Sequence, residues 1–355
     1  MSKPSLCVLL VMLSCCLAAI PSSAQSFVLD LPRGSQHSVV VQRVGITDIT
    51  LDYHRPLVNG RKIWGGLVPY GQVWRAGANE NTVIEFADAV TIDGKPLDKG
   101  RYGLHMIPGE SEWTVIFSKN STSWGSFTYK EAEDALRVTV KPQASDFHEA
   151  LTYDFDDVKA DSTLVTLRWE KLAIPFKVGV ATNDIVQASL QKQLRGLSQY
   201  TWMSWDDAAN YFLQNKIALD QALNYADRSI QVESRYDNLM TKANVLNALG
   251  RNDEAKPIVT QALAKADAFQ MHTYARQLQG EGKQDEAFKI FQDNAKKNPS
   301  AWVVHVGLAR MYCAEGKFPD ASKEMAVAIS GAPDGQKVPL QGLAKRLDNK
   351  EDINK

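Results

Sequence analysis

The spacing of apolar residues divides the chain into two halves. Between about residues 38 and 180, apolar and polar positions alternate, as in Ile49, Leu51 and Tyr53, and this predicts half-buried strands. Similar segments occur at 82–86, 90–92, 101–107, 113–117, 137–140, 151–155, 163–169 and 175–180. Short strands separated by turn signals predict an antiparallel β-sandwich, with a barrel as the alternative. One short helix is predicted at residues 129–136.

After about residue 183, apolar residues recur every three or four positions, which predicts helices. A glycine-to-alanine turn is repeated as GRNDEA, GKQDEA and GKFPDA, ending at Ala255, Ala287 and Ala321. These alanines are 32 and 34 residues apart, and Ala222 lies in a fourth, less regular copy. The unit resembles the tetratricopeptide repeat, a pair of helices that must stack on neighbours to bury its apolar face. An all-α, tetratricopeptide-like solenoid is therefore expected.

The N-terminus carries the pattern of a secretory signal. Lys3 precedes an apolar run at residues 6–13, and Ser22-Ser23-Ala24 is typical of a cleavage site. The expected domains are a signal peptide at 1–24, the β-sandwich at 25–180, a linker helix at 181–198 and the repeats at 199–355. An exported, periplasmic protein is predicted, with secretion or lipid anchoring as alternatives.

Composition and motifs narrow the function classes. The formal net charge is -1, so no basic excess favours nucleic-acid binding. Beyond the N-terminal signal, no apolar stretch reaches the ~20 residues of a membrane-spanning helix. HExxH, CxxC, GxSxG and P-loop motifs are absent from the sequence. We therefore expect no metal, no cofactor and no catalytic residue.

A glycine-rich stretch at residues 52–80 is the strongest candidate for a ligand site. It combines aromatic rings with guanidinium, amide and carboxylate groups, an inventory that binds sugars or carboxylates. The candidate residues are His54, Arg55, Arg61, Trp74, Arg75, Asn79 and Glu80. The ligand would be a small polar molecule or a glycan. Alternatively, an arginine held by Glu80 or Asp52, with Asn79 bonded to turn backbone, would simply fasten this connection to the sandwich.

Aligning the helical copies on their turn alanines places Asn244, Arg276 and Arg310 at equivalent positions of successive first helices. In tetratricopeptide repeats this position faces the concave surface. The three residues are therefore candidates for binding the acidic groups or the carboxyl terminus of a peptide. Solvated side chains without a partner are the alternative.

The first half also resembles a known family. The segments VGITDITLDYHRPLVNGRKIWGGLVPYGQVWRAGANENTVIEF and GRYGLHMIPGESEWTVIFSKN are similar to the bacterial domain of unknown function 2911, over residues 36–178. Members of that family often carry a signal peptide and C-terminal tetratricopeptide repeats. The resemblance implies an exported envelope protein, and it implies no substrate, cofactor or catalytic residue.

Taken together, these patterns predict an exported, non-enzymatic binding protein. The sandwich would recognise an envelope ligand, and the repeats would dock a protein or peptide partner. One alternative is an envelope hydrolase that acts on glycan or peptide through His54, Arg75 and Glu80. Another is a purely structural scaffold.

Overall fold

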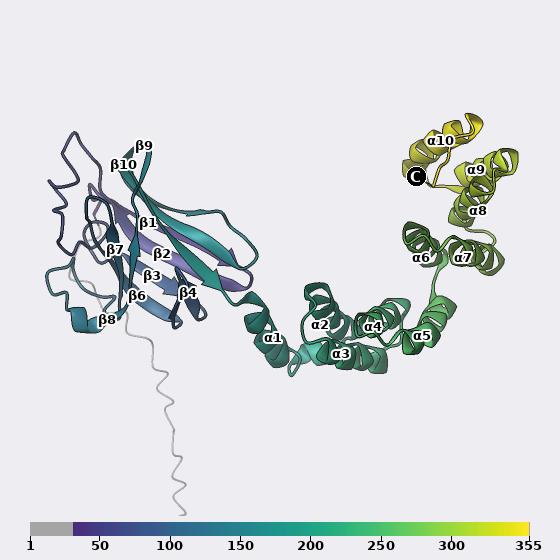
Figure 1. Ribbon diagram of the computed structural model, residues 1–355, viewed down its shortest axis with the longest axis horizontal. Coiled ribbons are helices and arrows are strands. Elements are labelled where there is room, and N and C mark those ends of the chain that lie inside the picture. The colour runs from purple at the N-terminus through teal and green to yellow at the C-terminus, as the bar shows by residue number, and fades with distance from the viewer. Residues whose placement is uncertain (1–30, 355) are drawn as a thin grey trace, which may run out of the picture. The chain divides into compact units, whose positions relative to one another are not determined.

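The computed structural model describes residues 31–354, so the predicted signal peptide at 1–24 lies outside the described residues. The chain divides into two compact units that meet between Val180 and Ala181 (Figure 1). The first unit consists of β-strands and the second of helices. Each unit is described by itself.

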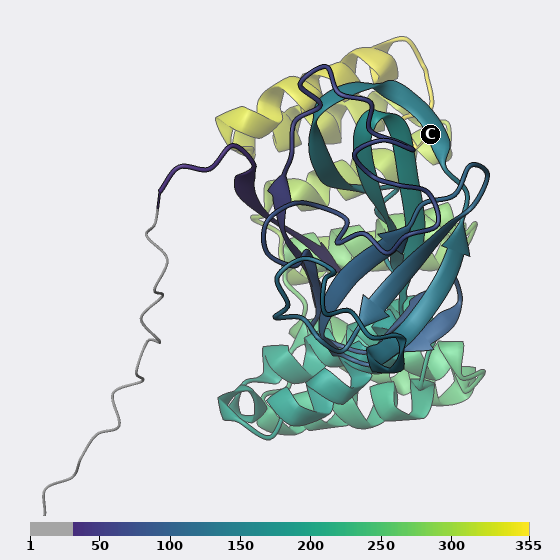
Figure 2. The same ribbon diagram turned by 90° about the vertical axis from the view of Figure 1, so that its left-hand side faces the viewer.

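The first unit is a sandwich of two antiparallel sheets (Figures 1 and 2), which confirms the predicted fold class. The six-stranded sheet has the order β1-β2-β3-β6-β7-β8, and the four-stranded sheet has the order β5-β4-β10-β9. The strands are β1 Gln36–Val44, β2 Thr47–Arg55, β3 Val83–Phe86, β4 Val90–Ile92, β5 Lys95–Leu97, β6 Gly100–Ile107, β7 Trp113–Ser118, β8 Asp134–Val140, β9 Gln143–Asp156 and β10 Ser162–Val180.

Large apolar side chains from both sheets form the core of the sandwich. Ile49, Leu51 and Tyr53 of β2 are fully buried, whereas the residues between them are partly exposed, as the period of two predicts. Across the core, the rings of Phe117 and Phe176 meet edge to face at 5.7 Å. The buried face of each sheet therefore comes from alternate positions along its strands.

The predicted helix at 129–136 is wrong. Only Glu131–Glu133 form a short 3-10 turn, and Asp134–Val140 is strand β8. The segment has good helix formers, but Leu136 pairs with Phe117 of β7, and pairing in the sheet overrides local propensity. The strands predicted at 163–169 and 175–180 are also one strand, β10, which continues through register shifts around Glu170.

The second unit contains ten α-helices among its described residues. They are α1 Thr182–Gln193, α2 Trp202–Asn215, α3 Leu219–Val232, α4 Tyr236–Ala248, α5 Asn252–Lys265, α6 Ala268–Gly280, α7 Gln284–Lys297, α8 Trp302–Ala314, α9 Phe318–Gly331 and α10 Asp334–Asp348. Helices α2 to α9 form four consecutive pairs, and α10 packs on the last pair. Figure 2 shows these helices side-on.

The repeated glycine turn has a clear physical role. Gly250, Gly282 and Gly316 all have φ between +74° and +77°. This left-handed backbone conformation is strained for other residues but not for glycine. The next amide in each turn bonds back to a carbonyl of the preceding helix, at 2.8–2.9 Å, as in a Schellman motif. Four equivalent alanines are almost fully buried where the paired helices touch: Ala222, Ala255, Ala287 and Ala321. These features confirm the predicted repeats.

The first helices of successive pairs are linked to one another. Asn210 of α2 donates to Thr241 of α4 at 3.1 Å, and Gln270 of α6 donates to Asp237 of α4 at 3.4 Å. The rings of Phe269 and Trp302 join α6 to α8, with 5.4 Å between their centroids. We call the surface formed by α2, α4, α6 and α8 the inner surface.

Candidate functional site

Tryptophans order the glycine-rich stretch of the sandwich. Trp74 stacks on Trp169, with ring centroids 5.9 Å apart and planes at 17°. Trp64 meets Trp113 edge to face at 4.9 Å. The backbone of Trp74 also exchanges two hydrogen bonds of 2.8 Å with Met106. The Trp74 ring is therefore a packing element that ties the loop to the core.

Two of the candidate arginines bind the protein's own backbone. Arg55 donates to the carbonyl of Leu151 at 3.0 Å and to the Thr152 hydroxyl at 2.9 Å, so it joins β2 to β9. Arg61 donates to the carbonyl of Val58 at 3.1 Å and closes the turn that contains it. These contacts match the fastening alternative.

Arg75 and Asn79 also serve the local turn. Arg75 donates to the carbonyl of Asn79 at 2.7 Å, and its guanidinium lies 5.9 Å from the centroid of the Phe127 ring. Burial lowers the pKa of Arg75, against the opposing effect of Glu80. Asn79 has φ +61° and donates to the carbonyl of Ser35 at 3.4 Å. Neither side chain lines the cavity described next.

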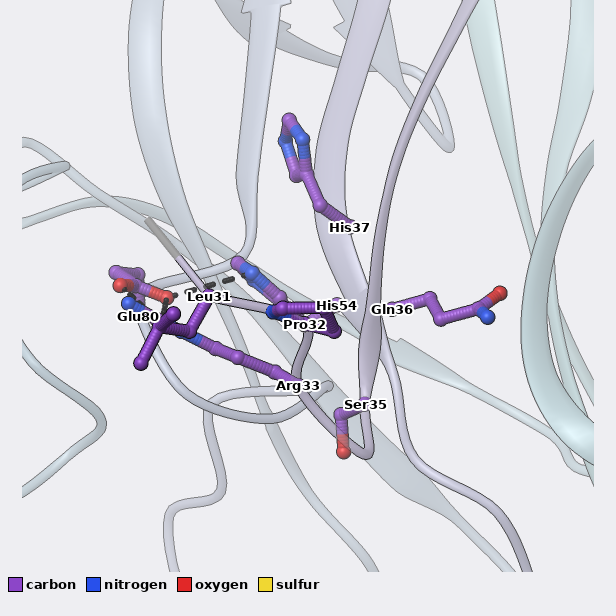
Figure 3. Close-up of a pocket in the computed structure, with 8 residues that line it drawn as sticks. All are labelled: Leu31, Pro32, Arg33, Ser35, Gln36, His37, His54 and Glu80. Carbon is purple, nitrogen blue, oxygen red and sulfur yellow. Dashed lines mark hydrogen bonds and ion pairs between the residues drawn. The ribbon is translucent and has the colours of Figure 1, made fainter. Parts of the chain in front are cut away.

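The remaining two candidates, His54 and Glu80, line a cavity of about 430 Å³ (Figure 3). Its lining residues are Leu31, Pro32, Arg33, Ser35, Gln36, His37, His54 and Glu80. Arg33 donates to both carboxylate oxygens of Glu80, at 2.6 and 3.0 Å. The other side of that carboxylate lies 3.5 Å from Nε2 of His54. The carboxylate is thus held between a guanidinium and an imidazole, and its partner is Arg33 rather than Arg75.

A second imidazole completes the cavity wall. His37 of β1 faces His54 of β2, with ring centroids 5.2 Å apart. Nε2 of His37 lies 2.7 Å from a carboxylate oxygen of Asp52. Next to the cavity, Trp124 is 53% exposed. The Arg33 guanidinium lies over the Trp124 ring, 5.9 Å from its centroid. Guanidinium, carboxylate, imidazole and aromatic groups therefore converge here; we call Arg33, His37, His54 and Glu80 the His-Glu pocket.

The charges in the His-Glu pocket follow from these contacts. Burial raises the pKa of Glu80, but the hydrogen bonds from Arg33 and from the Glu80 backbone, together with the charges of His54 and Arg33, outweigh this effect. The pKa is therefore lowered, and Glu80 is ionised at neutral pH. Burial lowers the pKa of His54; Glu80 raises it again in part, and His37 lowers it further. His54 is therefore a neutral ring at pH 7. Such a pocket suits a polar ligand that offers both donors and acceptors.

Sequence reasoning missed Arg33, His37 and Trp124. Arg33 lies 47 residues from its partner Glu80, and no local pattern links the two. His37 was predictable in principle, because β1 and β2 are adjacent antiparallel strands and their register places it opposite His54. Trp124 lies in the irregular connection between β7 and β8, where no periodicity guides a prediction.

Residues 35–178 match the family model described as protein of unknown function (DUF2911). This segment is similar to the DUF2911 family. The match confirms the resemblance seen in the sequence, and it includes three of the four residues of the His-Glu pocket, with Arg33 just outside. A comparison with curated proteins found no match.

In the helical unit, two of the three candidate residues contact the chain's own end. Arg276 of α6 donates to Gln279 at 2.7 Å and to the carbonyl of Asn354 at 3.5 Å. Arg310 of α8 donates to the carbonyl of Ile353. Asn244 of α4 is exposed and lies outside this cluster. We call residues 351–354 the C-terminal tail.

One solved structure similar to this chain is titled "Crystal structure of YrrB: a TPR protein with an unusual peptide-binding site". The two are 19% identical over 47% of this chain and 86% of that chain, with a TM-score of 0.30. The repeat architecture described here rests on the chain's own turn glycines, buried alanines and linked first helices.

Residues 31–354 contain neither a cluster of metal-ligating side chains nor a helix that could cross a membrane. No group of three or more histidine, cysteine, aspartate or glutamate side chains in that range is placed to hold a metal ion. Likewise, no helix in the described part of the chain is both long enough and apolar enough to span a bilayer.

Proposed function

We propose that the protein acts by binding, and that its helical unit docks an extended segment of a protein partner on the inner surface. The observation that carries the proposal is the position of the C-terminal tail. Its carbonyl oxygens accept hydrogen bonds from Arg276 and Arg310, which occupy equivalent positions of α6 and α8. An extended peptide on a row of arginine donors is a common mode of peptide recognition.

The β-sandwich contributes a second binding site in this proposal. Its ligand is a small polar molecule or a glycan held in the His-Glu pocket. Support comes from the convergence of Arg33, Glu80 and two imidazoles beside the exposed Trp124 ring. Glu80 is 43% exposed and bound to Arg33, so its lowered pKa makes it a weak general acid. For this reason we favour binding over the hydrolase alternative.

The proposed location is the cell envelope, with the protein exported to the periplasm. Support comes from the basic, apolar and small-residue order at the N-terminus, together with the DUF2911 match. A binding protein with two sites would connect a polar envelope ligand to a protein partner. A pure scaffold would use neither site.

Photocrosslinking in intact cells tests the docking surface. A photoreactive residue replaces Asn244, which is exposed on the inner helix α4. The matched control replaces Lys256, whose side chain is 76% exposed on the second helix α5. We expect a discrete crosslinked protein from position 244 and none from position 256. Equal patterns from both positions, or no product from position 244, would contradict docking on the inner surface.

A further inference from the structure

The C-terminal tail leaves helix α10 through a sharp reversal. Lys350 has φ +60°, and the amide of Glu351 bonds back to the carbonyl of Arg346 at 2.8 Å. The chain then runs back toward α8, where the sulfur of Cys313 lies within 3.7 Å of the carbonyl of Glu351. The tail therefore approaches the inner surface from outside the repeats, as a separate ligand would.

The tail binds through one apolar anchor and a set of polar contacts. Ile353 is 1% exposed and belongs to the apolar cluster between α8, α9 and α10. Its amide donates to the sulfur of Cys313 at 3.5 Å. The Asn354 side chain accepts from Gln279 of α6 and donates to the carbonyl of Arg310 of α8, both at 3.1 Å. An aliphatic residue followed by an amide is thus recognised at two adjacent points.

The surface offers more positive charge than the tail neutralises. Burial, with smaller contributions from the nearby charges of Arg276 and Arg346, lowers the pKa of Arg310 to about 10. The Nε atom of Arg310 is buried without a hydrogen-bond partner among residues 31–354. The tail accepts the hydrogen bonds of Arg276 and Arg310 through carbonyl oxygens, and its Glu351 carboxylate lies beside Arg346 instead, at 3.6 Å. A buried donor without a partner is costly, so an occupant that places a carboxylate here would bind better than the tail does.

A second buried group is unsatisfied at the same place. Nδ1 of His272 in α6 has no partner in the described part of the chain. Burial lowers the pKa of His272 to about 4, and the charges of Arg310 and Arg276 act in the same direction. The neutral ring therefore adds a polar contact and no charge. The cluster is open to one more hydrogen-bonding group from an occupant.

We infer that the C-terminal tail is an intramolecular ligand of the α6–α8 surface, displaced by a partner segment that carries a carboxylate beside an aliphatic residue. The inference rests on the proposed docking function and names the chemistry of the partner. In the absence of the partner the tail covers the arginines. The partner's aliphatic side chain takes the place of Ile353, and its carboxylate pairs with Arg310.

The first test uses a chain that ends at Lys350 and a fluorescent peptide of residues 348–355, DNKEDINK. We expect saturable binding to the shortened chain and at least tenfold weaker binding to the full chain, because the full chain already holds its own tail. In the shortened chain, Arg310→Ala should abolish binding, and the control Arg228→Ala in α3 should not. Equal binding to both chains, or no binding to a folded shortened chain, would overturn the inference.

A second test needs no deletion. The tail covers Cys313, so its release should expose this thiol to alkylation, read on the Cys313 peptide by mass spectrometry. In the full chain, Ile353→Ala should raise the alkylation rate at least tenfold. The control Val338→Ala, at a side chain 73% exposed on α10, should leave the rate unchanged. Equal rates in Ile353→Ala and the unchanged chain would refute a displaceable tail.

The two proposals fail separately. If the peptide binds in trans but position 244 gives no crosslink, the docking function is contradicted and the tail is still a ligand of the α6–α8 surface. If position 244 gives a crosslink but the peptide does not bind in trans, the inference about the tail is contradicted and the docking function is supported.

Discussion

His37 and His54 stand opposite each other on β1 and β2, with their ring centroids 5.2 Å apart. A second positive charge at this separation is unfavourable, so His37 lowers the pKa of His54. Each also has its own carboxylate, Asp52 for His37 and Glu80 for His54. The β1–β2 register therefore creates the His-Glu pocket, and its charge state depends on Glu80.

This relationship predicts the effect of Glu80→Gln. Glu80 raises the pKa of His54, so its loss should lower that pKa further, as measured by NMR titration of the ring protons. The lost ion pair with Arg33 is partly exposed and should cost less than about 1 kcal/mol of stability. Glu85→Gln, which removes a carboxylate paired with Arg101 on the same sheet, is the control. A higher His54 pKa in Glu80→Gln would contradict this geometry.

Trp74 should matter for stability more than for binding. Because its ring stacks on Trp169 in the core, Trp74→Ala should destabilise the β-sandwich by at least about 2 kcal/mol. The exposed Trp124 is the matched comparison, and Trp124→Ala should cost less than about 0.5 kcal/mol. Denaturant unfolding of the two variants measures both values. Similar losses in the two variants would argue against Trp74 as a packing element.

The buried His105 of β6 predicts a pH dependence. Burial lowers its pKa from 6.5 to about 4, although Asp134 raises it in part. Because the unfolded chain takes up the proton first, stability should fall as pH drops from about 6.5 toward 4, by about 3 kcal/mol in total. His105→Gln should flatten this slope, as measured by denaturant unfolding at a series of pH values. An unchanged slope in His105→Gln would mean that other groups cause the pH dependence of stability.

The turn glycines predict opposite effects for neighbouring substitutions. Gly282 has φ +77°, so Gly282→Ala should destabilise the helical unit by about 1 kcal/mol. Gly280 ends α6 without a positive φ, and an added methyl group would meet no atom within 4 Å. Gly280→Ala should therefore be neutral or stabilising, because alanine favours helix. Thermal unfolding compares the two, and equal melting temperatures would contradict the proposed turn geometry.

Regular patterns made much of the fold predictable. The alternation in β2 and the repeated glycine turn both come from single elements whose burial follows a fixed period. The helix predicted at 129–136 failed because Leu136 pairs with Phe117, a residue that lies outside any local window. Local periodicity describes how one element buries a face, and it does not describe which partner that element meets.

The candidate sites were predictable only in part. Arg276 and Arg310 were found because the repeats place them at equivalent positions, and they meet at the tail. The tail itself has no periodic signal. Arg33 contacts Glu80 because of the course of the chain before β1, which no sequence pattern predicts. Ligand binding by His54 and Glu80 stays a prediction. The structure assigns Arg55, Arg61, Trp74, Arg75 and Asn79 contacts that fasten the loop.

The most direct measurement of the central claim is the yield of the in-cell photocrosslink from position 244 in an Arg276→Ala/Arg310→Ala double variant. If partner docking depends on these arginines, the yield should fall at least fivefold. A control double variant, Arg228→Ala/Arg251→Ala, removes the same charge from α3 and from the turn before α5 and should retain the yield. An unchanged yield in Arg276→Ala/Arg310→Ala would contradict docking through the inner surface.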